Sequence, residues 1–143
     1  MRHLELGKSK IGRAMHYSVG AIIVKDDKIL LIDRAKPPFG YACPAGHVER
    51  GEEIVPALFR EVEEETGLHV EEHELLFEEE VDWNWCSLDI TSHYWYVYKC
   101  SATGTLSRNY IETKSIGWYT PEQIKKLNME PVWKYWLERF KVL

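Results

Sequence analysis

The sequence has few cysteines and no long apolar run. Cys43, Cys86 and Cys100 are odd in number, far apart and without a C-x-x-C pair, which favours neither a disulfide framework nor a zinc site. No apolar stretch approaches the roughly 20 residues that span a bilayer. The N-terminal stretch MRHLELGKSKIGRAMHYS lacks the apolar segment of a secretory signal. We therefore expect a cytoplasmic protein with no membrane partner.

Linkers, internal repeats and low-complexity tracts are also missing from the sequence. With 143 residues, of which 45% are hydrophobic and 29% charged, the chain has the composition of an ordinary globular protein. This length corresponds to one domain, which we assign to residues 1–143. The net charge of −5 argues against binding to an extended nucleic acid.

Hydrophobic periodicity predicts strands mixed with helices. Two strands within residues 16–35 flank a tight turn at Asp26-Asp27, and the Pro- and Gly-rich residues 36–53 read as loop. Further strands are predicted over 73–83, 87–101 and 114–120, and helices over 54–66, 121–127 and 130–143. The last helix carries an apolar stripe that we interpret as packing: Trp133, Trp136, Leu137 and Phe140. This pattern indicates an α/β (α+β) domain.

Glutamates are concentrated on and around the helix predicted over 54–66. Of the 23 acidic residues, 13 lie between Glu49 and Glu80, and all 13 are glutamates. Glu61, Glu64 and Glu65 fall within roughly one third of the helix circumference. They lie beside the stripe expected to face the core, which consists of Val55, Leu58, Phe59 and Val62. Carboxylates near a helix C-terminus cost stability. A bound divalent cation would offset their repulsion, and clustered carboxylate oxygens suit Mg²⁺ or Mn²⁺.

A longer motif surrounds these glutamates. Residues 46–68 read G-x5-E-x7-R-E-U-x-E-E-x-G-U, where U is bulky and aliphatic. The matching positions are Gly46, Glu52, Arg60, Glu61, Val62, Glu64, Glu65, Gly67 and Leu68. This pattern resembles the signature of the Nudix hydrolases, and no position departs from it. The resemblance implies a Nudix fold, in which a mixed β-sheet is sandwiched between helices. It also implies Mg²⁺- or Mn²⁺-dependent hydrolysis of nucleoside diphosphates linked to another moiety.

The resemblance also implies roles for single residues. Glu61, Glu64 and Glu65 match the positions that usually bind metal, Glu52 assists the metal site, and the carbonyl of Ala45 matches a backbone ligand of some members. Arg60 corresponds to the arginine that pairs with the loop glutamate, either for catalysis or as scaffold only. Gly46 would permit a turn, and Gly67 would cap the helix.

The resemblance implies a general base either on the signature helix or in a later loop. In the loop LSRNYIETKS, Glu112 is the leading candidate outside the helix, with an exposed loop glutamate as the alternative. A second outside candidate is the run Glu78, Glu79 and Glu80, which we rank below Glu112. We therefore group Glu52, Arg60, Glu61, Glu64 and Glu112 as the predicted catalytic residues.

The sequence defines the substrate only by elimination. A proline typical of relatives that cleave ADP-ribose and a tyrosine typical of dinucleoside-polyphosphate hydrolases are both missing downstream of the signature. A nucleoside triphosphate or related nucleotide is therefore expected. The alternatives are a nucleotide sugar, ADP-ribose, capped RNA, or nucleotide binding without catalysis. Dimers are common in the resembled family, so a homodimer is compatible with the sequence.

Candidate substrate contacts lie before the signature. Arg34 and Lys36 follow the second strand and would meet phosphates or solvent. Phe39 and Tyr41 would stack on a base or pack in the protein. Three tryptophans on or near the later strands have the same two interpretations: Trp83, Trp85 and Trp95.

Overall fold

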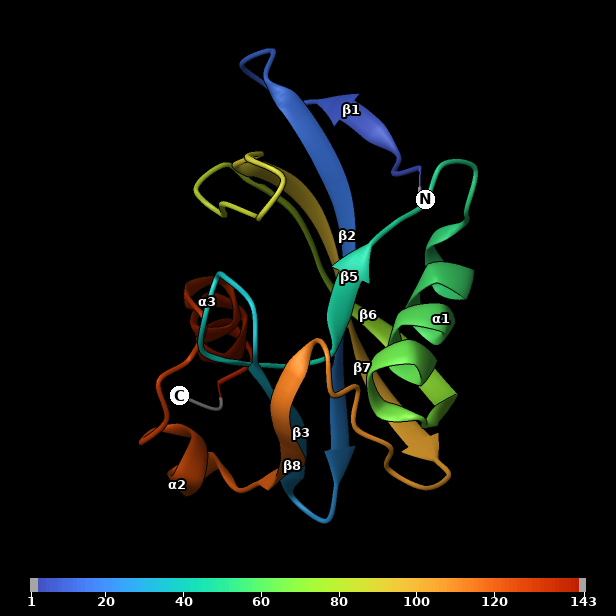
Figure 1. The fold of residues 1–143 in the computed structure, drawn as a ribbon, viewed down its shortest axis with the longest axis vertical. Helices are drawn as coiled ribbons and strands as arrows, with labels where there is room; N and C mark the ends of the chain where they lie inside the picture. Colours follow the sequence, from blue (N-terminus) through green and yellow to red (C-terminus); the bar gives the residue numbers. More distant parts are fainter. Residues whose placement is uncertain (1–2, 142–143) are drawn as a thin grey trace.

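The fold is organised around one long strand, β2. The computed structural model describes residues 3–141, with β2 spanning Ala14–Lys25. This strand pairs in parallel with β7 (Ser92–Thr103), and antiparallel with β1 (Leu6–Lys8) and β5 (Ala45–His47). On the far side of β7 lies β6 (His69–Val81). The parallel β2–β7 pair makes the sheet mixed (Figure 1).

A second group of strands diverges from the end of β2. β3 (Lys28–Arg34) pairs with β2 only near the turn at Asp26-Asp27, and then continues alongside β8 (Thr113–Tyr119) and β4 (Tyr41–Ala42). The two aspartates of the turn have positive φ values of 52° and 61°, which confirms the predicted tight turn. Because β3 diverges, its C-terminal end at Arg34 reaches the loops at the edge of the sheet (Figure 1).

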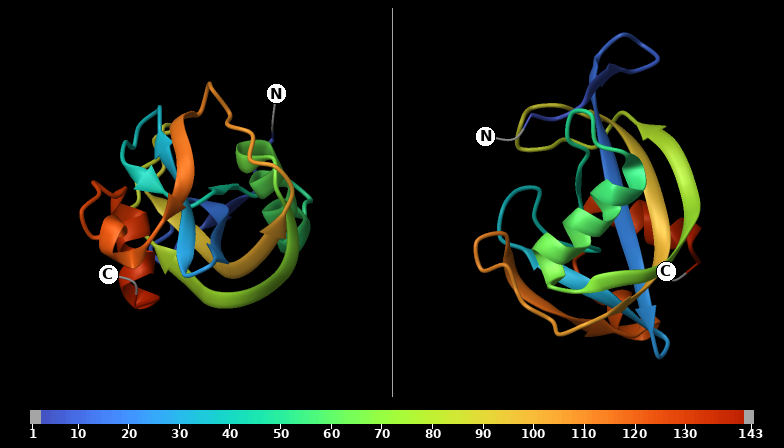
Figure 2. Two further views of the ribbon diagram at one scale, coloured as in Figure 1. Left: turned by 90° about the horizontal axis from the view of Figure 1, so that it is seen from below. Right: turned by 90° about the vertical axis from the view of Figure 1, so that its right-hand side faces the viewer.

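Helices cover both faces of the sheet. α1 (Ile54–Thr66) lies on one face, and α3 (Pro131–Arg139), preceded by α2 (Pro121–Ile124), lies on the other (Figure 2). β2 is buried on both sides because alternate residues contact different helices. Val19, Ala21 and Ile23 belong to the core under α1, whereas Ile22 belongs to the core under α3. This arrangement confirms the expected α+β class with a sheet between helices.

The α1 helix has the predicted bounds and buries Leu58 and Val62 as predicted, but Phe59 does not face the core. It ends at Gly67, whose φ of 75° lies in the left-handed region and whose N–H donates to Glu63 O, which confirms the predicted cap. Phe59, expected in the core, is 40% exposed and meets His73 edge to face, so that prediction was wrong. The buried face instead includes Glu61, which is 6% exposed. The helix is therefore rotated so that a carboxylate points inward.

Several other bounds differ from the sequence-based expectation. The predicted loop over 36–53 contains β4 and β5, β6 begins earlier at His69, and β7 begins later at Ser92. α2 has one turn only, and α3 ends at Arg139, while residues 142–143 lie outside the described part of the chain. The aromatic stripe of α3 packs as predicted, with Trp133, Trp136 and Leu137 buried and Phe140 against them. Over residues 3–141, none of the helices is long and apolar enough to cross a membrane.

Candidate active site

Arg60 on α1 joins the signature helix to the loop before it. Its Nε donates to Oε2 of Glu52 and its Nη2 donates to Oε1 of Glu52, both at 2.8 Å. Nη2 also donates to the carbonyl of His47 on β5, at 3.0 Å. The hydrogen bonds with Glu52, together with the charge of Glu61, raise the pKa of Arg60. This bidentate pair is the strong, geometrically specific form of the arginine–carboxylate interaction. Together with the hydrogen bond to His47, this pair connects the segment 47–52 to α1.

The three helix glutamates that the sequence singled out converge next to this pair. Glu61 accepts from Arg60 Nη1 at 2.7 Å, and Glu64 accepts from the same atom at 3.4 Å. Glu65 accepts from the backbone N–H of Ala45 on β5 at 3.1 Å. Burial and the neighbouring Glu61 carboxylate raise the pKa of Glu65 well above its usual range. Glu65 is therefore the member of the cluster at which desolvation and repulsion by a neighbouring carboxylate both disfavour charge.

Gly46 lies against this cluster in a way that the sequence did not predict. We expected it to permit a turn, but it is part of β5 and is not among the residues with positive φ. A Cβ at this position would stand 2.0 Å from Cδ of Glu61. Glycine is required here for space, because any side chain would displace the buried carboxylate.

A cleft opens over these carboxylates. It is lined by Glu61, Glu64 and Glu65 together with Arg34, His47, Asn109 and Glu112. The donor set consists of carboxylate oxygens with backbone of β5 nearby, which fits a hard divalent cation such as Mg²⁺ or Mn²⁺. Such a cation would also offset the repulsion that raises the pKa of Glu65.

The structure separates the two outside candidates for the general base. Glu112 lines the cleft, and Nζ of Lys36 donates to its carboxylate at 3.4 Å. The run on β6 lies elsewhere: Glu78 accepts from Tyr94, Glu79 from Tyr135, and Glu80 from the backbone N–H of Lys10. The structure thus brings Glu112, and none of these three, to the helix glutamates.

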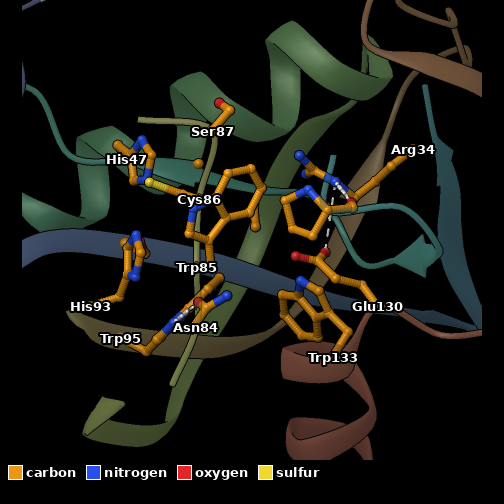
Figure 3. Close-up of a pocket in the computed structure, with 14 residues that line it drawn as sticks. Arg34, His47, Asn84, Trp85, Cys86, Ser87, His93, Trp95, Glu130 and Trp133 are labelled. Carbon is orange, nitrogen blue, oxygen red and sulfur yellow. Dashed lines mark hydrogen bonds and ion pairs between the residues drawn. The ribbon is translucent and has the colours of Figure 1, made fainter. Parts of the chain in front are cut away.

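A second, narrower pocket adjoins the cleft and shares Arg34, Ala45, Gly46 and His47 with it. In Figure 3 the side chains of Arg34 and Glu130 face each other across this pocket, with Trp133 below them. Nε of Arg34 lies 3.9 Å from the Glu130 carboxylate and donates to the carbonyl of Pro38 at 2.7 Å. Burial raises the pKa of Glu130 to about 7, although the charge of Arg34 opposes this shift.

The sequence-based reasoning missed the polar groups of this pocket. Glu130 was placed inside the last helix, whereas it is the N-cap of α3, held by its N–H donating to Tyr41 O. Asn84 lies in the loop between β6 and β7, and its Oδ1 accepts from Nε1 of Trp95 at 3.0 Å. The sequence signal for this N-cap position was Pro131, because proline is favoured in the first turn of a helix and so indicates that the residue before it is the cap.

The four predicted substrate contacts divide into two groups. Arg34 lines both pockets, and Lys36 lies at the edge of the cleft beside Glu112. Phe39 is 56% exposed beneath the Lys114 ammonium, and Tyr41 packs edge to face on Tyr119. Neither aromatic residue lines either pocket, so the structure does not bring these two rings to the site.

A further cluster was not anticipated. His16, His47, His93 and Cys86 place one potential ligand atom each within 4.8 Å of one another. Burial lowers the pKa of all three histidines, to about 3 for His47 and about 4 for His93, and the charge of His16 adds to the effect on both. No sequence motif indicates this group, because its members lie far apart along the chain.

The sequence is similar to those of known proteins. A family model described as the NUDIX domain matches residues 14–140. Over 53 residues the chain is 53% identical to an ADP-ribose pyrophosphatase from Methanocaldococcus jannaschii, covering 36% of this chain and 31% of that protein. Over 72 residues it is 46% identical to an 8-oxo-dGDP phosphatase from Homo sapiens, covering 48% of this chain and 22% of that protein. The chain thus spans about a third or less of the length of these curated relatives.

A solved structure shows the same fold. The crystal structure of a MutT NUDIX hydrolase from Burkholderia pseudomallei superposes with a TM-score of 0.68 at 26% identity, covering 76% of this chain and 85% of that one. The intact signature, the glutamate cluster that it forms and the family match over nearly the whole chain lead to one conclusion: the chain belongs to the NUDIX domain family.

Proposed function

We propose that this protein hydrolyses a pyrophosphate bond in a nucleoside diphosphate linked to another moiety, with Mg²⁺ or Mn²⁺. The expected substrate is a nucleoside triphosphate or related nucleotide. The observation that carries the proposal is the convergence of Glu61, Glu64 and Glu65 beside the Arg60–Glu52 pair in one cleft. A module that only bound nucleotides would not need this set of carboxylates intact.

The divalent cation would be held by Glu61, Glu64 and Glu65, with Glu52 and the carbonyl of Ala45 assisting. When bound, it would lower the pKa of a water and neutralise phosphate charge. Arg60 positions Glu52 and Glu61 through its hydrogen bonds, and Arg34 faces the cleft where the phosphates would lie. Glu112 is the proposed proton acceptor for the attacking water, because it lines the same cleft as the helix glutamates. Glu64 is the competing acceptor on the helix.

The narrower pocket supports a purine base as the part that is recognised. Its walls include Trp85, Trp95 and Trp133, and it contains the buried carboxyl group of Glu130 and the amide of Asn84. An ionised Glu130 would accept hydrogen bonds from the N–H groups of a guanine-type edge, and Trp85 offers a partly exposed ring for stacking. The similarity to an 8-oxo-dGDP phosphatase agrees with this choice, whereas the similarity to an ADP-ribose pyrophosphatase favours the main alternative.

Two further expectations are part of the proposal. The three cysteines are free thiols, and Cys43 and Cys100 are buried, which agrees with a reducing cytoplasm. A small nucleotide is the expected partner, and a homodimer stays a prediction that sedimentation equilibrium would test.

The test is product release from a panel of substrates, each with Mg²⁺, with Mn²⁺ and with EDTA. The panel contains canonical and 8-oxo nucleoside di- and triphosphates, ADP-ribose, nucleotide sugars, dinucleoside polyphosphates and a capped oligoribonucleotide. Metal-dependent turnover highest for guanine-type nucleotides would support the whole proposal. Preference for ADP-ribose would overturn the base assignment and leave the reaction class standing. Absence of turnover on every substrate would contradict the enzymatic proposal.

A further inference from the structure

The cluster of His16, His47, Cys86 and His93 is built from four separate segments. His16 lies on β2, His47 on β5 and His93 on β7, while Cys86 lies in the connection between β6 and β7. The Sγ of Cys86 lies 3.9 Å from Nδ1 of His16, and one ligand atom from each of the four residues lies within 4.8 Å of the others. Figure 3 shows Cys86 next to His47, with His93 close below.

Strand pairing fixes the positions of the three histidines. His16 and His93 are direct partners in the parallel β2–β7 ladder. Ser18, two residues after His16 and therefore on the same face, is the partner of His47 in the β2–β5 ladder. The rings consequently pack together, with centroids 4.5 Å apart for His16 and His47 and 5.4 Å for His47 and His93. The backbone thus holds three imidazoles on one face before any ligand binds.

Two histidines of the cluster are buried, and one of its nitrogen atoms lacks a hydrogen-bond partner among the described residues. His16 is 3% exposed and His93 is 1% exposed. Nδ1 of His93 has no hydrogen-bond partner among the described residues. Burying a polar atom without a hydrogen-bond partner costs free energy, so most buried polar atoms in proteins have one. An atom without a partner therefore needs an explanation, such as a ligand that binds there. A neutral imidazole nitrogen without a hydrogen-bond partner is the form that binds a metal ion.

The donor set indicates which metal would bind. Three imidazole nitrogens and one thiolate are unsuited to Mg²⁺, which prefers oxygen, and are the ligands typical of Zn²⁺ in closed tetrahedral sites. Zn–N distances of about 2.0–2.1 Å and a Zn–S distance of about 2.3 Å place tetrahedral donors roughly 3.3–3.7 Å apart. Closing the cluster around an ion would therefore require a contraction of about 1 Å at its widest pair. Cys86 lies in a loop and is only partly buried, so it is the residue that can move.

We propose that His16, His47, Cys86 and His93 bind one Zn²⁺ ion at a structural site that adjoins the carboxylate cleft, which His47 also lines. The ion fastens the connection between β6 and β7 to the face of the sheet. That connection contributes Asn84, Trp85, Cys86 and Ser87 to the wall of the narrower pocket. Zinc therefore orders one wall of the pocket without belonging to the hydrolytic centre.

The test uses the full chain, free of any affinity tag and stripped of metal by a chelator, with Mg²⁺ in excess to saturate carboxylates. Co²⁺ is titrated in as a spectroscopic probe, and Zn²⁺ is then added in competition. We expect one equivalent of Co²⁺ with the visible bands of tetrahedral coordination and a thiolate-to-cobalt charge-transfer band, both abolished by one equivalent of Zn²⁺. Failure to bind either ion stoichiometrically would overturn the proposal.

Variants locate the ion. Cys86→Ala should remove the charge-transfer band and weaken zinc binding by more than the roughly 10–100-fold that loss of an outer-shell partner costs. His69→Gln, at an exposed histidine, and Glu64→Gln, in the carboxylate cleft, should both retain the full spectrum. Loss of binding in Glu64→Gln, or an unchanged spectrum in Cys86→Ala, would place the ion elsewhere and contradict the assignment.

The melting temperature gives an independent readout that needs no substrate. One equivalent of Zn²⁺ should raise it in the wild type and in Glu64→Gln, because an ion that binds only the folded state stabilises that state. Cys86→Ala should fold, since its side chain lies in a loop, and should show no such rise. An equal rise in Cys86→Ala would overturn the site, whether or not the protein hydrolyses nucleotides.

Discussion

Gly46 and Glu61 are in such close contact that a methyl group on residue 46 would overlap the carboxylate of residue 61. The Cβ of an alanine would lie 2.0 Å from Cδ of Glu61 and 2.2 Å from one carboxylate oxygen. Glu61 has little freedom to retreat, since it is buried and accepts a hydrogen bond from Arg60. A side chain on residue 46 of β5 would therefore have to displace the Glu61 carboxylate of α1.

Gly46→Ala should therefore displace the Glu61 carboxylate. A misplacement of about 1 Å in a catalytic group can cost about 10²-fold in rate, and we expect a loss of that order in kcat. The apparent affinity for Mg²⁺ should fall as well. The control is Gly117→Ala on β8, where a Cβ would meet Tyr119 at an ordinary 3.5 Å. Steady-state kinetics over a range of Mg²⁺ concentrations measures both effects, and equal behaviour of the two variants would contradict the explanation.

Glu64→Gln should cut turnover by about 10²–10⁴-fold, because the cleft loses a carboxylate proposed to bind metal or accept a proton. Its melting temperature should stay close to that of the wild type, since Glu64 is exposed. Glu63→Gln is the matched control one residue away, where the side chain points to solvent near His69. Full activity of Glu64→Gln with the best substrate would remove the site assignment.

Arg60→Ala should destabilise the protein by about 2–3 kcal/mol, because Glu52 and Glu61 lose a partly buried guanidinium that donates to both. Arg60→Lys should recover only part of this loss, since an ammonium cannot form the two parallel hydrogen bonds to Glu52. Urea unfolding measures the difference. Because Mg²⁺ would replace some of the missing positive charge, the loss should be smaller with Mg²⁺ than with EDTA. A loss that is unaffected by metal would argue that Arg60 and the metal site are uncoupled.

Glu130 should make stability depend on pH in a defined window. Its pKa is raised from 4.5 to about 7 in the folded protein, so the folded state keeps the proton while the unfolded state loses it. The contribution of Glu130 to the free energy of unfolding is full below about pH 4.5, falls as the pH rises toward 7, and then stays low. Relative to the variant Glu130→Gln, the wild type should lose up to roughly 3 kcal/mol across this window.

The measurement for Glu130 is the difference in unfolding free energy between wild type and Glu130→Gln, from urea titrations between about pH 5 and pH 8. Other titrating groups, including Glu65, are common to both proteins and cancel to a first approximation. Glu138→Gln, on the exposed side of the same helix, is the control and should show no such trend. A difference that does not change with pH would contradict the raised pKa.

The parts of the molecule that could be predicted from sequence are those specified by residues close together in the chain. The periodicity and Gly67 define helix α1, and three glutamates within five positions define one of its faces. The exact rotation of that helix was not predictable, because the choice between Phe59 and Glu61 as the inward residue depends on the Arg60–Glu52 pair and on the space beside Gly46. Local pattern thus identified the element, and tertiary contacts decided its orientation.

Features assembled from distant segments could not be predicted in the same way. The parallel pairing of β2 with β7 brings His16 beside His93, although 77 positions separate them in the sequence. Glu130 becomes a pocket residue only because β3 carries Arg34 to the start of α3. The position of Tyr41 in the sequence suggested stacking on a base, but its ring packs edge to face against Tyr119 of β8 instead.

The division between the cleft and the narrower pocket has a consequence for how such a protein can evolve. Helix α1 and strand β5 hold the glutamate cluster, whereas the connection between β6 and β7 and the start of α3 supply other residues to the narrower pocket: Asn84, Trp85, Cys86, Ser87, Glu130 and Trp133. A surface connection tolerates substitution and insertion better than a buried helix does. Under the proposed function, selection can therefore exchange the nucleotide that is recognised by changing residues 82–91, while the residues proposed to carry out hydrolysis, held by Arg60 and Gly46, are inherited without change.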